Sequence, residues 1–278
     1  MKELTFHIIA VLVNYNYGNR AAYLIRKVLL LPSISRVIVI DNASLDNSIH
    51  LVENLKDTRV TVIKNKENLG YDKAVNIGIK QALLEGCRYV MLLDADLIFK
   101  TDFITRLAQT GADVLVPVLK FRRKEDWIYD YGGKVNWILG RTYHIESTSR
   151  ILAKTEIYPD FVSGGCTLIR KEVFDRIGLY DERFFLYFGD ADFALRARKA
   201  GFEVVTYPRA IVIHNISEHK FSHNWFKTKL SLQGNLTFIN KWISWYFRPF
   251  AYTYFLALIS KVLFNLLIYR LSDYKKSQ

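Results

Sequence analysis

The first 120 residues alternate between short apolar runs and amphipathic segments, and this alternation limits the possible folds more than any other feature. The apolar runs predict strands at residues 6–13, 36–40, 59–63, 88–93 and 114–119. The segments between them predict helices at residues 20–30, 46–55 and 73–84. Strands that alternate with helices in this way predict an α/β domain with a mostly parallel central sheet and right-handed crossovers.

The pattern is less regular after residue 119. Residues 120–160 carry a basic run, a Gly-Gly pair and four aromatic residues between Trp127 and Trp137, and they predict a long functional loop or a small subdomain. Further strands are predicted at 161–170, 203–206 and 211–214, with helices from Lys171 and over 191–200. We therefore expect one domain over residues 1–218, with halves of about 1–119 and 120–218, and a tail over 219–278.

The tail differs from the rest of the chain in composition. Residues 249–269 are almost wholly apolar and long enough to cross a bilayer, but Lys261 near the middle disfavours a true span. Trp242, Trp245 and Arg248 flank this stretch, and such residues favour the headgroup level. We expect a helical tail that lies on a membrane surface. A span, a core helix and an interface in a homo-oligomer remain alternatives.

The charge balance narrows the class of partner. The chain has 278 residues and a formal net charge of +12, which favours an acidic partner such as nucleic acid, anionic lipid or a phosphorylated ligand. From residue 221 onward, eight basic residues face one acidic residue. Because much of the excess lies in the apolar tail, we expect no nucleic-acid binding. The two cysteines, in apolar elements without paired spacing, predict buried thiols in a reducing compartment.

Polar residues follow each of the early strands. Because parallel strands present their carboxyl ends at one edge, these residues should assemble there. Such an edge suits a nucleotide: an aromatic ring for the base, polar groups for base and ribose, and a divalent cation between two aspartates for a diphosphate. Ordinary strand-ending turns are the alternative for any single loop. The candidate residues are Asn14, Tyr15, Asp41, Asn68, Asp94 and Asp96.

The chain lacks the two glycine-rich phosphate motifs, Gly-x-Gly-x-x-Gly and Gly-x-x-x-x-Gly-Lys-Ser/Thr. A cation and basic residues such as Lys73 would have to meet the charge of a diphosphate. This argues against dinucleotide dehydrogenases and P-loop enzymes. A sugar-nucleotide nucleotidyltransferase is the rival enzyme class, and it would need a basic glycine-rich loop that residues 14–18 do not provide.

A second acidic cluster follows an aromatic loop. Asp192 is four residues before Arg196 and should form a structural ion pair on a helix. Asp190 could cap that helix, or it could accept a proton from a substrate hydroxyl that approaches Gly164 and Gly165. His214 ends an apolar strand and is either structural or a metal ligand.

These stretches together resemble the inverting nucleotide-sugar glycosyltransferases of the GT-A fold, in the rhamnosyltransferase-like and galactofuranosyltransferase-like branch. The resemblance runs in order from residue 8 to residue 214, whereas the loop at 120–160 and the tail do not match. It is carried by residues 13–16, 39–46, 68–78, 92–96, 162–170 and 181–196.

The resemblance implies roles for particular residues. Within Asp94-Ala95-Asp96, Asp96 matches the metal-binding acid, and Asp94 lies nearer the ribose and diphosphate. His214 matches the family's histidine ligand, and Asp190 matches the catalytic base. The family usually carries an acid just before this base, where this chain has Gly189. That departure puts the choice of acceptor in question.

The expected reaction is the transfer of a sugar, with inversion, from a UDP- or dTDP-sugar to a hydroxyl. Mn²⁺ or Mg²⁺ is the expected cofactor, and the histidine ligand favours Mn²⁺. Residues 1–119 would bind the donor, and residues 120–218, with Trp127, the acceptor. The tail suggests a lipid-linked glycan acceptor in surface polysaccharide synthesis, used by an enzyme peripheral to the cytoplasmic face of the cell membrane.

Overall fold

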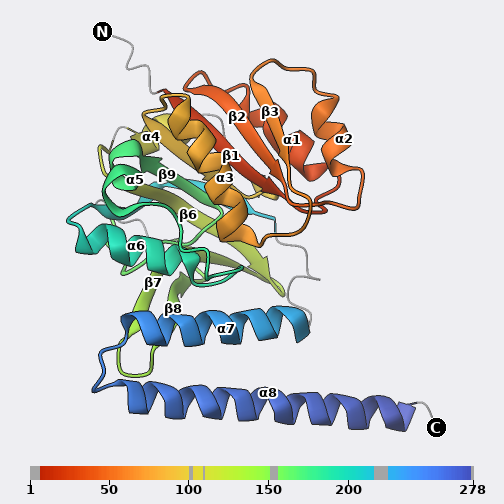
Figure 1. Cartoon of the computed structure of the whole chain (residues 1–278), viewed down its shortest axis with the longest axis vertical. Coiled ribbons are helices and arrows are strands. Elements are labelled where there is room, and N and C mark those ends of the chain that lie inside the picture. The colour runs from red at the N-terminus through yellow and green to blue at the C-terminus, as the bar shows by residue number, and fades with distance from the viewer. Residues whose placement is uncertain (1–6, 100–102, 109, 151–155, 216–224, 277–278) are drawn as a thin grey trace.

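A computed structural model describes residues 7–99, 103–108, 110–150, 156–215 and 225–276 of the chain. One sheet with strand order β3-β2-β1-β4-β9-β6-β10-β5 forms the centre, and helices cover both faces (Figure 1). The strands that follow the predicted alternation are β1 (Ile8–Asn14), β2 (Ile34–Asp41), β3 (Val60–Lys64) and β4 (Tyr89–Leu93). The helices between them are α1 (Arg20–Val28), α2 (Ser48–Glu53) and α3 (Tyr71–Leu84). These four strands are parallel, as predicted.

The residues of β1 alternate between the two faces of the sheet. Ile8, Ala10 and Leu12 belong to the core beneath α1, while Ile9 and Val11 belong to the core beneath α3. Side chains of a strand point alternately to opposite faces, so a strand that is apolar throughout is buried on both. The wholly buried β1 therefore lies in the middle of the domain.

The sheet as a whole is mixed, which corrects the prediction that it is mostly parallel. β9 (Cys166–Arg170) lies antiparallel between β4 and β6 (Val114–Arg123). β10 (Val204–His214) is parallel to β6, and the short β5 (Leu97–Ile98) is antiparallel to β10. The expected boundary near residue 119 falls within β6. The remaining helices of the domain are α4 (Phe103–Ala108), α5 (Lys171–Ile177) and α6 (Gly189–Lys199).

Residues 120–160 contribute strands that reverse the direction of the chain between β6 and β9. β6 continues to Arg123 and pairs with β7 (Asp126–Asn136), which pairs with β8 (Arg141–Ser147), all antiparallel. The register of β7 and β8 is irregular between Asp130 and Gly133. A Cβ atom on Gly133 would lie 2.1 Å from the Phe161 ring, so only glycine fits there. This irregularity hides the alternating pattern of a strand in the sequence.

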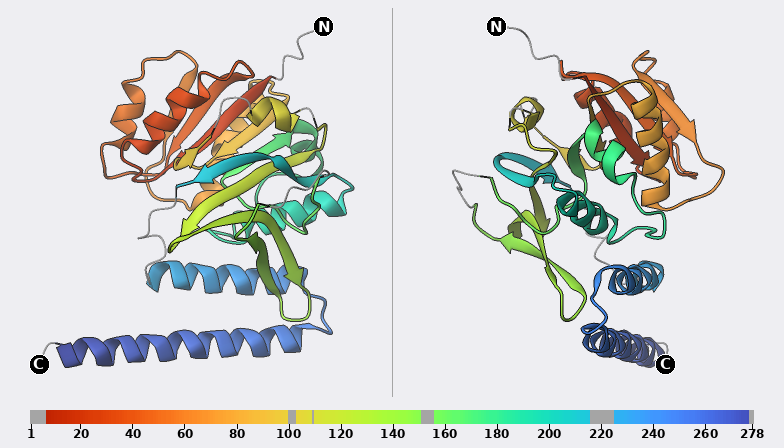
Figure 2. Two further views of the ribbon diagram at one scale, coloured as in Figure 1. Left: turned by 180° about the vertical axis from the view of Figure 1, so that it is seen from behind. Right: turned by 60° about the vertical axis from the view of Figure 1, so that its left-hand side comes forward.

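The tail forms two helices that cover one end of the domain, α7 (Trp225–Trp242) and α8 (Arg248–Lys276) (Figures 1 and 2). Asp192 on α6 holds α7 in place, because Lys241 Nζ lies 2.6 Å and Trp242 Nε1 2.8 Å from its Oδ1 atom. The predicted pair with Arg196 is confirmed, at 2.8 Å. The expected domain boundary at residue 218 lies outside the described residues.

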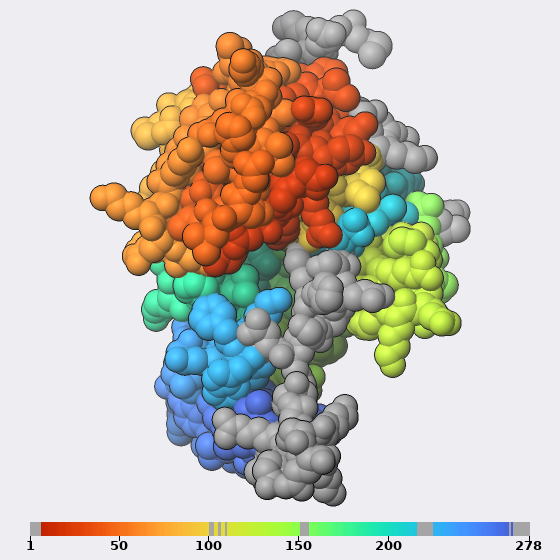
Figure 3. Space-filling view, turned by 90° about the vertical axis from the view of Figure 1, so that its right-hand side faces the viewer, coloured from red at the N-terminus to blue at the C-terminus, as the bar shows by residue number. Residues whose placement is uncertain are grey.

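α8 packs on α7 through Ile239, Ile243, Ala251 and Phe255. Among the described residues, one helical segment, Arg248–Leu266, is long and apolar enough to cross a membrane, and little of it is buried in the protein. In the space-filling view the two helices form one end of the molecule (Figure 3). The helical nature of the tail is thus as predicted, and its contact with a membrane stays a prediction.

Candidate active site

Asp94, Asp96 and His214 come together at the carboxyl end of the central strands. The two aspartates follow β4, and antiparallel pairing of His214 with Leu97 brings the end of β10 beside them. His214 Nε2 lies 3.0 Å from Asp96 Oδ1 and 3.6 Å from Asp94 Oδ2. One ligand atom from each of the three residues lies within 4.8 Å of the others.

This arrangement fits a divalent cation. Neighbouring ligands of a six-coordinate ion bound at about 2.1 Å lie roughly 3 Å apart, which is the spacing found here between His214 and Asp96. Carboxylate oxygens suit Mg²⁺ and Mn²⁺, and an imidazole among them favours a transition metal. Gly165, at φ +103°, leaves the approach open, because a Cβ atom there would lie 3.3 Å from Asp94 Oδ2.

The predicted nucleotide-binding residues lie along the same edge but differ in exposure. Asn14 is fully buried, and its amide donates to Asp41, Ser44 and Ser48 at 2.8 to 3.0 Å. Asn14 therefore joins the loops after β1 and β2, and its amide nitrogen is used within the protein. Asp41 is also buried, whereas Tyr15 is 43% exposed and available for stacking.

Asn68 and Lys73 flank the start of α3. Asn68 Oδ1 accepts hydrogen bonds from Asn42 Nδ2 at 2.8 Å and from the Gly70 amide at 3.0 Å, which fixes the loop before the helix. Lys73 is exposed in the first turn of α3. No observation tests the donor contacts of Asn14, Tyr15, Asp41, Asn68, Lys73, Asp94 and Ala95, and these stay predictions.

Asp190 lies at the start of α6, against the glycine pair that also borders Asp94 and His214. A Cβ atom on Gly164 would lie 2.2 Å from Asp190 Oδ2, and one on the next residue, Gly165, would lie 3.3 Å from Asp94 Oδ2 and 3.7 Å from His214 Cε1. Burial and then the negative charge of Asp94 raise the pKa of Asp190 to about 7, although His144 and the Gly164 amide act against this rise. A carboxylate with that pKa suits a general base near neutral pH.

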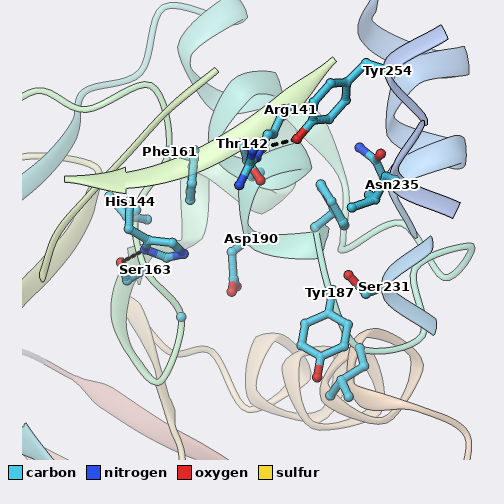
Figure 4. Close-up of a pocket in the computed structure, with 16 residues that line it drawn as sticks. Arg141, Thr142, His144, Phe161, Ser163, Tyr187, Asp190, Ser231, Asn235 and Tyr254 are labelled. Carbon is cyan, nitrogen blue, oxygen red and sulfur yellow. Dashed lines mark hydrogen bonds between the residues drawn. The ribbon is translucent and has the colours of Figure 1, made fainter. Parts of the chain in front are cut away.

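Asp190 also lines a cavity of about 430 Å³ between the sheet domain and the tail helices. Figure 4 shows Asp190 near the centre of this cavity, with His144 on one side and Tyr187 on the other. Ser231 and Asn235 from α7 and Tyr254 and Leu258 from α8 contribute to its wall. The tail is therefore part of the candidate site. The predicted acceptor residue Gly164 lines the cavity, whereas Trp127, beneath the Lys120 ammonium on the β6–β7 hairpin, does not.

His144 is a site residue that the sequence analysis missed. Its Nδ1 atom lies 2.9 Å from Oδ2 of the buried Asp130, which also accepts a hydrogen bond from Ser163 at 2.8 Å. Burial lowers the pKa of His144, but the Asp130 hydrogen bond and the negative charges of Asp130, Glu146 and Asp190 raise it overall. The positive imidazolium is thus favoured beside Asp190. Only the pairing of β7 with β8 brings His144 here, so no local motif marks it.

We expect the pH profile of turnover to reflect these two groups. Asp190 must be deprotonated to act as a base, so kcat/KM should fall about tenfold per pH unit below its pKa of about 7. His144→Gln removes a positive charge that lowers the pKa of Asp190, so its acidic limb should move to higher pH. Initial rates between pH 5 and 9 test this, and an acidic limb that moves to lower pH in the variant would contradict it.

Gly189, at the position where the resemblance leads us to expect an acid, has a structural explanation. The carboxylate of Asp72, in the first turn of α3, lies against Gly189, so that a Cβ atom at position 189 would lie 2.0 Å from its Oδ2 atom. Asp72 is 2% exposed, and burial followed by the charges of Asp190 and Asp192 raises its pKa well above the usual range. A carboxyl group from α3 thus occupies the space beside Asp190 that a side chain at position 189 would need.

Gly189→Glu should therefore destabilise the protein, by about 1–3 kcal/mol from overpacking alone. Asp72→Ala should largely restore the melting temperature in the double variant, because it empties the same space. Thermal unfolding of both single variants and the double variant measures this coupling. Strictly additive effects would show that the two side chains do not compete for one place.

Comparison of the sequence with known protein families identifies a family whose matched region includes Asp94 and Asp96. The sequence model of the family "Glycosyl transferase family 2" matches residues 9–178, more than half of the chain, including the strands and loops that carry Asp94 and Asp96. The chain belongs to glycosyl transferase family 2. This confirms the resemblance drawn from the motifs.

Two curated relatives of this family 2 protein are rhamnosyltransferases. It is 28% identical over 187 residues to the dTDP-rhamnosyl transferase RfbF of Shigella flexneri, over 66% of this chain and 60% of that protein. It is 42% identical over 55 residues to an N-acetylglucosaminyl-diphospho-decaprenol L-rhamnosyltransferase of Mycobacterium tuberculosis, over 20% of this chain and 18% of that protein. The chain thus spans less than two thirds of each relative.

A solved structure shares the fold of the family 2 chain. The mannosyltransferase PcManGT of Pyrobaculum calidifontis, in complex with GDP-Man and Mn²⁺, aligns with a TM-score of 0.60 at 15% identity. The alignment covers 88% of this chain and 68% of that one. At this identity the likeness supports the GT-A-like arrangement of the mixed sheet and its helices and nothing finer.

Proposed function

We propose that the chain is a metal-dependent inverting glycosyltransferase that moves a sugar from a UDP- or dTDP-sugar to a hydroxyl group. The observation that carries the proposal is the position of Gly164 and Gly165. Gly165 lies beside Asp94 and His214, and Gly164 lies against Asp190, so the groups suited to a metal diphosphate and the group suited to a base flank two adjacent residues. A sugar between them would face a leaving diphosphate on one side and an activated hydroxyl on the other.

The reaction would proceed as a single displacement. Asp190 takes the proton from the acceptor hydroxyl, whose oxygen forms a bond to the anomeric carbon while the bond to the diphosphate breaks on the opposite face. When bound, Mn²⁺ or Mg²⁺ would offset the negative charge on the departing diphosphate. Asp96 and His214 would hold the ion, and Asp94 would lie nearer the ribose and diphosphate.

The test of this function is the anomeric configuration of the product. Proton NMR during turnover of a UDP- or dTDP-sugar with Mn²⁺ should show a product whose anomeric configuration is opposite to that of the donor. A product with retained configuration would exclude a single displacement with Asp190 as base.

The proposed acceptor is a lipid-linked glycan at the cytoplasmic face of the cell membrane. Exposed apolar residues of α8 support this: Phe250, Leu256, Leu263, Phe264 and Ile268. At about 100° per residue they fall within an arc of roughly 140°. The opposite side of α8 packs on α7 and lines the cavity. One face of α8 would therefore lie in the membrane while the other borders the acceptor site.

Liposome flotation tests the role of α8. The full chain should float with vesicles that contain phosphatidylglycerol, and replacing Leu256, Leu263 and Phe264 by Ser should reduce the floating fraction several-fold. Leu45→Ser together with Leu84→Ser, at exposed leucines away from the tail, is the matched control and should float like the native chain. Equal flotation of the α8 variant would reject its role.

A further inference from the structure

Arg141 stands at the side of the cavity next to α8. Its Nη1 atom donates a 2.6 Å hydrogen bond to the Tyr254 hydroxyl, and its guanidinium lies 5.7 Å from the centre of the same ring. Figure 4 shows this pair beside the tail helices, with Asp190 further into the cavity. Arg141 is exposed, so most of its hydrogen-bond donors remain available to a ligand.

Arg141 differs from the paired arginines of the chain. Arg123, Arg170, Arg183 and Arg196 each form an ion pair with a carboxylate, whereas Arg141 forms none with any residue that the structure describes. The charged groups that line the cavity are Arg141, His144 and Asp190. His144 already has a carboxylate partner, because its Nδ1 atom lies 2.9 Å from Asp130 Oδ2. Within the described part of the chain, the guanidinium is therefore a cation at the cavity wall without a carboxylate partner.

The backbone before Arg141 is fixed by both tail helices. Gly140, at φ +61°, fits so closely that a Cβ atom there would lie 2.6 Å from Ile239 and 3.3 Å from Ala251. Asn235 donates a 2.8 Å hydrogen bond to the Gly140 carbonyl. The hairpin that carries Arg141 is thus docked on α7 and α8. A side chain on such a rigid support is suited to recognise a ligand at a defined distance from Asp190.

We infer that Arg141, oriented by Tyr254, binds a phosphate group of the acceptor, so that the acceptor sugar reaches Asp190 while its lipid chain leaves along α8. The guanidinium matches the geometry of a phosphate because two of its N–H groups can donate in parallel. Leu258 and Tyr254 offer the apolar surface next to that phosphate. The inference rests on the proposed function and adds that the acceptor is joined to its lipid through phosphate.

Two acceptors that share one sugar provide the test. One is N-acetylglucosamine joined through a diphosphate to a short polyprenyl chain, and the other is the neutral octyl N-acetylglucosaminide, both in neutral detergent. Arg141→Gln should raise the KM of the diphosphate acceptor about 10- to 100-fold and leave kcat and the KM of the octyl glycoside unchanged. Tyr254→Phe should raise the same KM less. Arg26→Gln, an exposed arginine on α1, is the control.

A binding measurement separates this inference from the proposed function. Calorimetry with farnesyl diphosphate in EDTA, which prevents binding of the diphosphate through a metal, should show affinity for the native chain and its loss in Arg141→Gln. This result would support the phosphate site even if neither sugar acceptor were used. The inference would be overturned if Arg141→Gln raised the KM of both acceptors equally. It would also be overturned if Arg141→Gln left the binding of farnesyl diphosphate unchanged. An effect of Arg141→Gln confined to flotation with phosphatidylglycerol vesicles would overturn it too, and would assign Arg141 to membrane headgroups.

Discussion

Asp190→Asn should reduce sugar transfer by at least about 10³-fold, near the upper part of the range for a general base. Asn has nearly the same shape but cannot accept the proton of the acceptor hydroxyl. Donor affinity should stay close to the native value, because Asp190 lies on the acceptor side of Gly164. Initial rates of nucleoside diphosphate release in the presence of acceptor, together with calorimetric titration of the donor, measure the two effects separately.

A matched control for this variant is Asp175→Asn. Asp175 is exposed on α5, where it pairs with Lys171, and its replacement should leave turnover unchanged. Near-native turnover of Asp190→Asn would show that Asp190 is not the catalytic base. A loss of donor binding as large as the loss of turnover would instead place Asp190 in the donor site.

Asp96→Ala should abolish metal-dependent donor binding. Removing a group that hydrogen-bonds to a metal ligand typically lowers metal affinity 10- to 100-fold, so removing a ligand itself should lower it at least about 100-fold. His214→Ala should have a similar effect, because its Nε2 atom lies 3.0 Å from Asp96 Oδ1. Calorimetric titration of the nucleotide-sugar with and without Mn²⁺ gives the comparison.

The same titration can contradict the assignment. If Asp96→Ala binds the donor as tightly as the native chain, and with the same dependence on Mn²⁺, then Asp96 does not hold the ion. If metal dependence is lost in Asp96→Ala but kept in His214→Ala, the imidazole is a neighbour of the ion and not a ligand.

The residues that could be placed from the sequence lie at the ends of regular elements. Asp94 and Asp96 follow a buried strand, and His214 ends another, so the direction of the strands and the family resemblance together place them at one edge. The structure brings them together. Asn14 shows the limit of this reasoning, because the position at a strand end does not reveal that its amide bonds to Asp41, Ser44 and Ser48.

The remaining site residues depend on contacts between elements distant in sequence. His144 reaches Asp190 only because β7 and β8 pair across an irregular register at Gly133. Asp72 lies beside Gly189 only because the start of α3 packs against the start of α6. Tyr254 comes from a tail that follows more than 100 residues after Arg141. Periodicity and local motifs carry no information on such pairs.

The most direct test of the central claim is thermal unfolding of the full chain with a panel of UDP- and dTDP-sugars, with and without Mn²⁺. A donor at ten times its Kd should stabilise the native chain by about 1.4 kcal/mol, equal to a rise of a few degrees in Tm. We expect this rise for a nucleotide-sugar only with Mn²⁺ or Mg²⁺, and its absence in Asp96→Ala. Stabilisation by a nucleotide-sugar that is equal without metal and in Asp96→Ala, or no stabilisation by any of them, would contradict the account.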